Sequence, residues 1–170
     1  WQVTPVEAYM RIVKATESEV GSDESMENAL VSSMSEDDLR WFISHPDMMF
    51  CSDGELHGTH PRGAGAFPRV LGRYVREEKV LPLEAAIHKM SGLPAAQLGL
   101  KDRGRIAAGY VADLVVFDPA IVIDQSTVEN PEAPPLGIPD VMVSGEWVVR
   151  DGKVTGHRPG RVLRSPAFQP

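Results

Sequence analysis

The chain has 170 residues, of which 42% are hydrophobic, and a formal net charge of -7. This length and apolar content allow a buried core, so we expect a folded protein. The acidic balance and the scattered Lys and Arg argue against nucleic acid or an anionic lipid surface as partner, because both draw on clustered positive charge. The single cysteine, Cys51, excludes an internal disulfide, and no apolar run approaches the ~18 residues of a membrane helix. These features predict a cytoplasmic protein.

The chain opens on a predicted helix. Residues 4–15 begin with a capping box formed by Thr4 and Glu7, and their apolar residues recur at helical spacing. Because Trp1 stands directly before this helix start, we expect the chain to be part of a longer protein. The polar stretch 16–28 predicts a loop.

The next residues predict a parallel βαβ unit. The runs 29–34 and 47–52 are short and apolar, which is typical of buried strands. Between them, residues 35–45 predict a helix that begins at Ser35 and stops before Pro46. Strand, helix and strand in succession are the pattern of a parallel sheet.

The middle of the chain predicts helices, and the last third predicts a small β unit. Helices are expected over 67–79, over 81–92 with Gly92 at the end, and over 94–98. Strands are expected over 112–118 and within 140–156, where Ser144–Gly145 and Asp151–Gly152 suit hairpin turns. The proline-rich stretch 126–139 predicts a surface loop.

The acid Asp53 directly follows the predicted strand 47–52. Ligands of parallel α/β sheets and barrels lie at the carboxyl ends of the strands, so we expect its carboxylate between a dry barrel interior and a solvated pocket. A carboxylate in that setting can hold a metal-bound water and move its proton. The alternative is that Asp53 and Gly54 only form a turn, which is a common use of Asp-Gly.

Two histidines follow Asp53 closely. His57 and His60 have a spacing that would allow joint metal binding on a helix, but Gly58 and Pro61 disfavour a helix here. The alternative is that both are ordinary loop histidines.

An arginine and a cysteine flank the same stretch. Arg62 could clamp a substrate carboxylate through its planar guanidinium, with a surface salt bridge as the alternative. Cys51 lies within the predicted strand, and we interpret it as a packing residue rather than a nucleophile or ligand.

Five stretches of the chain together carry a family resemblance. They are "SDG" at 52–54, "HPR" at 60–62, "FPRVLGRYVRE" at 67–77, "LPLEAAIHKMSGLPAAQLGLKDRGRIAAGYVADLVVFDP" at 81–119 and "VMVSGEWVVRDGKVTGHRPGRVLR" at 141–164. They closely resemble the carboxyl-terminal part of the N-acyl-D-amino-acid deacylases, the D-aminoacylase branch of the amidohydrolase superfamily. The pattern from Gly104 to Asp118 is general to amidohydrolases, whereas the HPR and FPRVLGRYVRE motifs point to the deacylase branch.

The resemblance implies an α/β fold in two parts. Residues 1–98 would supply the last strands and helices of a metal-dependent (β/α)8 barrel, and residues 99–170 part of a small β-sandwich. It implies that Asp53 faces or binds a zinc-activated water, accepts its proton and donates it to the departing nitrogen. It also implies that Arg62 lies near the substrate carboxylate.

The resemblance further implies that most zinc ligands lie upstream of this chain. The His-x-His pair of the family is absent from the sequence, so Asp53 is at most one ligand among several. Cys51 stands on a different strand from the cysteine ligand of the family. We therefore expect the isolated chain to bind no catalytic zinc and to hydrolyse nothing.

For the complete protein, the resemblance implies a zinc-dependent hydrolase that splits N-acyl-D-amino acids into a carboxylate and a D-amino acid. Its partners would be this small substrate and the missing barrel strands, from the same polypeptide or another chain, because two barrel strands alone leave unpaired edges. A dihydroorotase-like or hydantoinase-like cyclic-amide hydrolase is one alternative. A non-catalytic remnant that acts as an interaction module is another.

Overall fold

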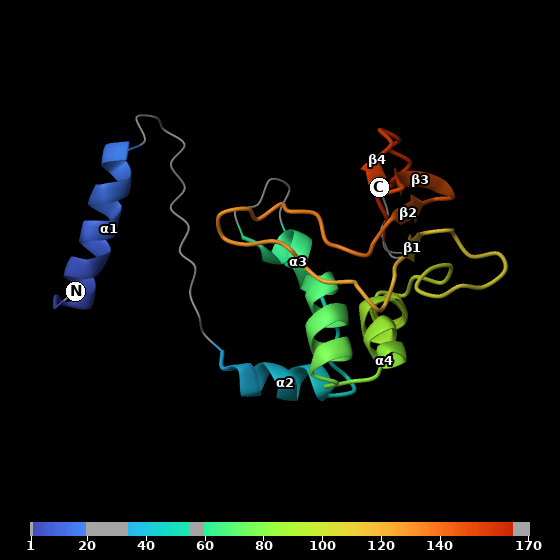
Figure 1. Cartoon of the computed structure of the whole chain (residues 1–170), viewed down its shortest axis with the longest axis horizontal. Helices are drawn as coiled ribbons and strands as arrows, with labels where there is room; N and C mark the ends of the chain where they lie inside the picture. The colour runs from blue at the N-terminus through green and yellow to red at the C-terminus, as the bar shows by residue number, and fades with distance from the viewer. Residues whose placement is uncertain (1, 20–33, 55–59, 165–170) are drawn as a thin grey trace. The chain divides into compact units, whose positions relative to one another are not determined.

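The computed structural model describes residues 2–19, 34–54 and 60–164, which belong to two separate units, residues 1–33 and 34–170. The first unit contains α1, Pro5–Glu19 (Figure 1). The predicted capping box is present: the amide of Thr4 donates to the Glu7 carboxylate at 3.0 Å, and the amide of Glu7 donates to Oγ1 of Thr4 at 3.3 Å. The predicted strand 29–34 lies outside the described residues, apart from Met34.

The second unit begins with α2, Glu36–Ser44. The prediction of Ser35 as its cap is confirmed, because Oγ of Ser35 accepts a hydrogen bond from the amide of Asp38 at 3.1 Å. The helix ends before Pro46, also as predicted.

The predicted strand over residues 47–52 is not formed, so the expected βαβ unit is not observed. A strand is stabilised only by hydrogen bonds to a neighbouring strand. Within the described ranges, no strand lies beside this segment; instead the amide of Phe50 donates to the carbonyl of Lys89 at 3.2 Å. The prediction of a buried strand is therefore wrong, and Met48 and Met49 within it are 41% and 43% exposed.

Helical segments then follow one another through the middle of the chain. They are α3 (Arg62–Arg69), η1 (Val70–Glu77), α4 (Leu83–Ile87), η2 (His88–Gly92) and α5 (Leu93–Gln97). The prediction of helices here is confirmed, although α3 begins earlier than expected, at Arg62. The prediction that Gly92 ends a helix is wrong: its φ of -64° is helical, and the chain leaves the helix near Gly99, whose φ is 70°.

The core of the second unit lies between α2, η1 and α4, with one contribution from the loop that follows β1. Its buried residues are Ile43, Val70, Leu71, Tyr74, Leu81, Ala86 and Val122. None of the helices in the described ranges is long and apolar enough to cross a membrane.

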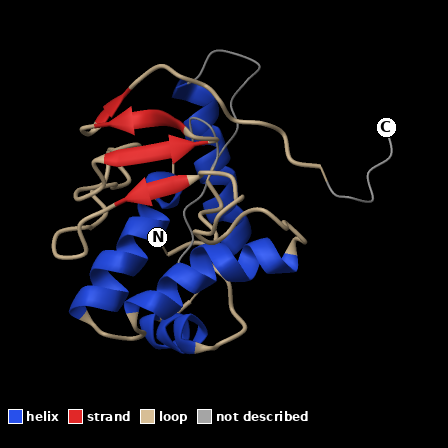
Figure 2. Ribbon diagram, turned by 90° about the vertical axis from the view of Figure 1, so that its right-hand side faces the viewer, coloured by secondary structure: helices blue, strands red, loops and turns tan. Residues whose placement is uncertain are grey.

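A small antiparallel sheet occupies the last third of the chain (Figure 2). Its strands, in spatial order, are β1 (Leu114–Val116), β2 (Asp140–Val143), β3 (Glu146–Arg150) and β4 (Lys153–Val154). Both predicted hairpin turns are confirmed, because Ser144, Gly145, Asp151 and Gly152 all have positive φ, as a two-residue hairpin turn of this type requires. The predicted loop 126–139 is irregular, but Ser126 and Ala133 within it are buried.

Candidate functional site

Asp53 lies at the end of an irregular segment rather than of a strand. Its φ is 48°, a left-handed conformation that few residues other than glycine adopt readily. Its side chain is 73% exposed, because the described part of the chain builds no barrel strands around it. The expected dry barrel interior is therefore not formed by these residues alone.

Arg62, the first residue of α3, contacts Asp53 twice. Its Nη2 lies 2.8 Å from Oδ2 of the Asp53 carboxylate, and its Nε donates to the main-chain carbonyl of Asp53 at 2.9 Å. One guanidinium thus fixes both the side chain and the backbone of the acid, which a planar group with several donors can do. The structure brings together two residues that the sequence analysis had considered separately.

The backbone beside this pair is closely packed. A Cβ atom added to Gly54 would lie 2.7 Å from Cα of Gly63, so only glycine fits where the chain returns to meet itself. The amide of Gly54 donates to Oγ of Ser52 at 3.2 Å. Arg62 therefore forms the surface salt bridge that was the alternative to a substrate clamp, whereas no regular turn is assigned at Asp53 and Gly54 in the described residues.

His60 stabilises the start of α3 through one ring nitrogen. Its Nδ1 accepts a hydrogen bond from the amide of Arg62 at 3.0 Å, which leaves Nε2 as the nitrogen available to another group. His57 lies outside the described residues. The prediction that Cys51 is a packing residue is wrong, because its side chain is exposed where the expected strand is not formed.

The described residues do not by themselves fit a zinc ion. A zinc site takes about four ligands, and within residues 34–54 and 60–164 no three His, Cys, Asp or Glu side chains gather for one. Asp53 is the candidate ligand, and Arg62 already occupies one of its carboxylate oxygens.

The arrangement places a proton acceptor beside an anion-binding group. An exposed carboxylate can take a proton from water and return it, and a guanidinium can hold a carboxylate. Sequence reasoning missed two residues of the loop after β1: Asp124, which accepts a hydrogen bond from Arg69 of α3, and Ser126, which donates to the carbonyl of Pro61 just before this helix. They lie more than fifty residues further along the chain, so no local pattern signals them.

Comparison with known proteins gives the same family from sequence and from structure. The model of the amidohydrolase family matches residues 5–149. Three proteins of Alcaligenes xylosoxydans xylosoxydans are 46–48% identical over 134 to 142 residues: a D-aminoacylase, an N-acyl-D-glutamate deacylase and an N-acyl-D-aspartate deacylase. The matches cover 76–82% of this chain but 26–29% of these relatives, so the chain spans little more than a quarter of their length.

Solved structures agree with the sequence matches. A crystal structure of D-aminoacylase, 47% identical, aligns with a TM-score of 0.70 over 73% of this chain and 27% of its own length. The N-acyl-D-glutamate deacylase of Bordetella bronchiseptica, solved with zinc and a phosphonate inhibitor, is 42% identical, with a TM-score of 0.65 over 71% of this chain and 27% of its own.

Similarity to the cyclic-amide hydrolases is weaker and shorter. A dihydroorotase of Lactobacillus acidophilus is 32% identical over 73 residues, which is 43% of this chain and 16% of the dihydroorotase. The deacylase matches are both more similar and almost twice as long. The extent of these matches, in sequence and in structure, means that the chain belongs to the amidohydrolase family, in its D-aminoacylase branch.

Proposed function

We propose that the complete protein containing this chain hydrolyses the amide bond of N-acyl-D-amino acids, and that Asp53 moves the proton in this reaction. The carboxylate takes a proton from the attacking water and then gives it to the nitrogen that leaves as the D-amino acid. The zinc expected in the complete protein would polarise the amide carbonyl and acidify the water. Its remaining ligands would come from the rest of the polypeptide.

The pairing of Asp53 with Arg62 is the observation that carries this proposal. In an N-acyl amino acid, the amide nitrogen and the carboxylate are attached to the same carbon atom. A site for this substrate therefore needs its proton carrier and its anion anchor close together. Nη2 of Arg62 lies 2.8 Å from the Asp53 carboxylate, and among the described residues nothing binds Nη1, whose N–H groups could hold a substrate carboxylate.

The relatives support the substrate class and leave its side chain open. A match of 134 residues or more within a chain of 170 includes the positions of Asp53 and Arg62. Two of the relatives are named for D-glutamate and D-aspartate substrates and the third for no particular side chain, yet all three are almost equally identical to this chain. We therefore infer the class, N-acyl-D-amino acids, and no particular side chain.

The proposal is tested on the full-length protein with its metal. Activity should be measured on N-acyl-D-amino acids, their L enantiomers, hydantoins and dihydroorotate. Hydrolysis confined to the N-acyl-D-amino acids would support the proposal. Preference for the cyclic amides would favour the dihydroorotase-like alternative, and no hydrolysis of any of them would favour a non-catalytic interaction module.

A substitution then tests the role of Asp53. Asp53→Asn should lower kcat by about 10²–10⁴-fold, because asparagine cannot accept the proton. Asp151→Asn is a matched control, since Asp151 also precedes a glycine and has a φ of 51°, close to the 48° of Asp53. Full activity of Asp53→Asn would overturn the proposed role.

A further inference from the structure

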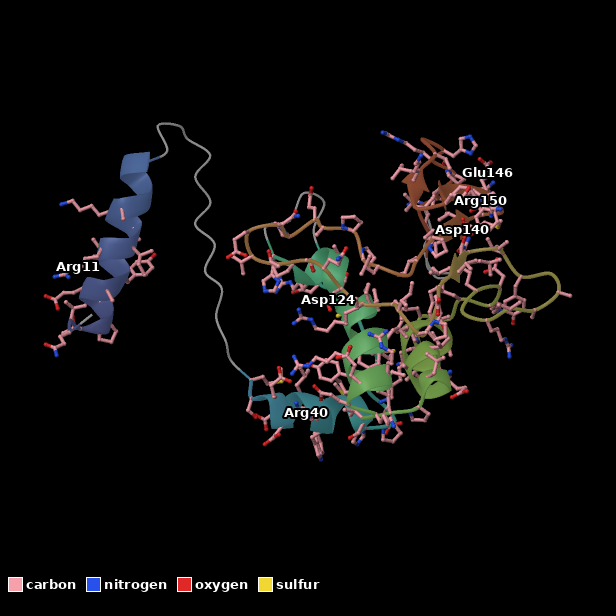
Figure 3. The ribbon with its side chains drawn as sticks, in the orientation of Figure 1. Arg11, Arg40, Asp124, Asp140, Glu146 and Arg150 are labelled. Atoms are coloured by element: carbon pink, nitrogen blue, oxygen red, sulfur yellow. The ribbon has the colours of Figure 1, made fainter. Side chains whose placement is uncertain are left out.

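One segment of the loop after β1 packs against the helices that lead from the candidate site. Residues 122–126 run beside α3 and η1, as the orange loop in Figure 1 and the position of Asp124 in Figure 3 show. This segment is more buried than a surface loop: Val122 is 1% exposed, Ser126 is 6% exposed, and the Asp124 side chain is 8% exposed. The burial of two polar side chains calls for partners, and the helices provide them.

Polar contacts fix the segment along the helices. Arg69 of α3 donates from Nε and Nη2 to Oδ2 of Asp124, at 2.9 and 2.6 Å. Further along, Nη1 of Arg76 donates to the carbonyl of Val122 at 2.5 Å. Charge-assisted bonds of this kind are the stronger hydrogen bonds of proteins, and they resist sliding of the segment along the helix.

Two glycines allow the segment to approach this closely. A Cβ atom on Gly65 would lie 2.3 Å from Oγ of Ser126, and one on Gly72 would lie 2.5 Å from the carbonyl oxygen of Val122. Any larger residue at either position would push the segment away from the helix. Small residues in α3 and η1 and polar residues in the 122–126 segment therefore both contribute to this packing.

The contact nearest the candidate site is made by Ser126. Its hydroxyl donates to the carbonyl of Pro61 at 2.8 Å. Pro61 directly precedes Arg62, and its carbonyl also accepts the amide of Gly65 at 2.9 Å, in the first turn of α3. Ser126 thus holds the peptide unit from which the Arg62 side chain projects.

We propose that Ser126 is a positioning residue for Arg62, and that it thereby sets how tightly the site holds the substrate carboxylate. The inference rests on the proposed function, because it assigns Arg62 to the substrate. Ser126 touches neither Asp53 nor the substrate in this scheme. Its loss should weaken binding of a carboxylate while leaving the proton transfer at Asp53 in place.

The first test uses the full-length protein and the variant Ser126→Ala. For an N-acyl-D-amino acid, we expect KM to rise about tenfold with kcat close to that of the unmodified protein, which is the effect of one hydrogen bond on binding. The inhibition constant of the corresponding carboxamide, which lacks the carboxylate, should not change. Ser91→Ala is the matched control, because Oγ of Ser91 also donates to a backbone carbonyl, that of Ile87, at 2.7 Å.

A second measurement does not depend on activity. Hydrogen exchange of the backbone amides of residues 62–65 should become faster in Ser126→Ala and stay unchanged in Ser91→Ala. If the unmodified protein hydrolyses no N-acyl-D-amino acid, the proposed function fails, and faster exchange would still support the positioning of Arg62. Unchanged exchange together with an unchanged KM would overturn the inference. Equal losses for the carboxylate and the carboxamide would overturn it as well, because a merely structural role predicts them.

Discussion

Arg62 holds Asp53 by two atoms, since it donates from Nη2 to the carboxylate at 2.8 Å and from Nε to the main-chain carbonyl at 2.9 Å. The second bond matters because Asp53 has a φ of 48°, which an aspartate adopts only at some cost. The same guanidinium therefore keeps the backbone in this conformation and directs the carboxylate.

Arg62→Lys should show whether the site needs only the positive charge of Arg62 or also the geometry of its guanidinium. Lysine keeps the positive charge but lacks the planar fork whose separate nitrogens bind the carboxylate and the carbonyl, so kcat/KM of the full-length protein should fall by about tenfold or more. Arg105→Lys is a matched control, because Arg105 also uses Nε and Nη2 on one partner, the Tyr110 hydroxyl, at 3.0 and 2.8 Å. Equal activity of the two variants would show that charge alone suffices at Arg62.

Gly72→Ala should destabilise the second unit. Alanine normally stabilises a helix by about 1 kcal/mol relative to glycine. Here its Cβ would lie 2.5 Å from the carbonyl oxygen of Val122 and 2.4 Å from Cδ1 of Ile123, and overpacking of this kind costs about 1–3 kcal/mol. The clash should therefore outweigh the helix preference and lower the free energy of unfolding in denaturant titration. Gly160→Ala, where no atom of the described residues lies within 4 Å of the added Cβ, should have little effect.

The ion pairs of Glu78 predict a dependence of stability on pH. Hydrogen bonds from Arg40 and Arg73 lower the pKa of Glu78 from 4.5 to about 2. Because the folded-state pKa lies below the unfolded one, the stabilisation is fully present above about pH 4.5 and is lost as the pH falls toward 2. The difference in thermal midpoint between the unmodified protein and Glu78→Gln should therefore shrink over this range. A difference that is the same at pH 6 and pH 2.5 would contradict the assignment.

Lys89 joins α2 to the segment that leads to Asp53. Its buried ammonium donates to the carbonyls of Ile43 and His45 at the end of α2, and its own carbonyl accepts the amide of Phe50. Lys89→Met keeps most of the volume but removes the ammonium donor from both carbonyls, of which that of His45 still accepts the amide of Met48 at 3.3 Å, so we expect a loss of about 1–3 kcal/mol. Lys153→Met, on exposed β4, should change stability far less, and chemical denaturation of both variants measures the difference.

Zinc titration of the isolated chain should reveal no tight stoichiometric site. Residues 34–54 and 60–164 bring no three metal-binding side chains together, and a single carboxylate binds zinc weakly. Isothermal calorimetry with the full-length protein as positive control makes the comparison. A tight site that disappears in Asp53→Asn would show that this chain supplies a zinc site of its own.

Local features of this chain could be predicted from the sequence, whereas features that depend on distant residues could not. The Ser35 cap and the Ser144–Gly145 turn are set by a few neighbouring residues, and both were predicted. The segment 47–52 has the composition of a strand, but a strand needs a partner, and composition does not provide one. The boundary of two domains near residue 98 stays a prediction.

In the candidate site, too, the residues could be predicted from the sequence, whereas their contacts could not. Asp53 and Arg62 were identified as residues of interest, but their direct contact depends on the path of the chain between them. The contact between Ser126 and Pro61 joins residues 65 positions apart, and nothing in either local sequence indicates it. The proline content of residues 126–139 predicted a surface loop, whereas the structure buries Ser126 within it.

The sheet and the 122–126 segment differ in how far along the chain their partners lie, and this difference sets an order of assembly. Strands β2, β3 and β4 pair with immediate neighbours through two-residue turns, whereas Arg69 and Asp124 are 55 residues apart. Closing the longer loop costs more entropy, so the hairpins should form first and the support beneath Arg62 last. The backbone support of Arg62 would then arise only in the final step of folding.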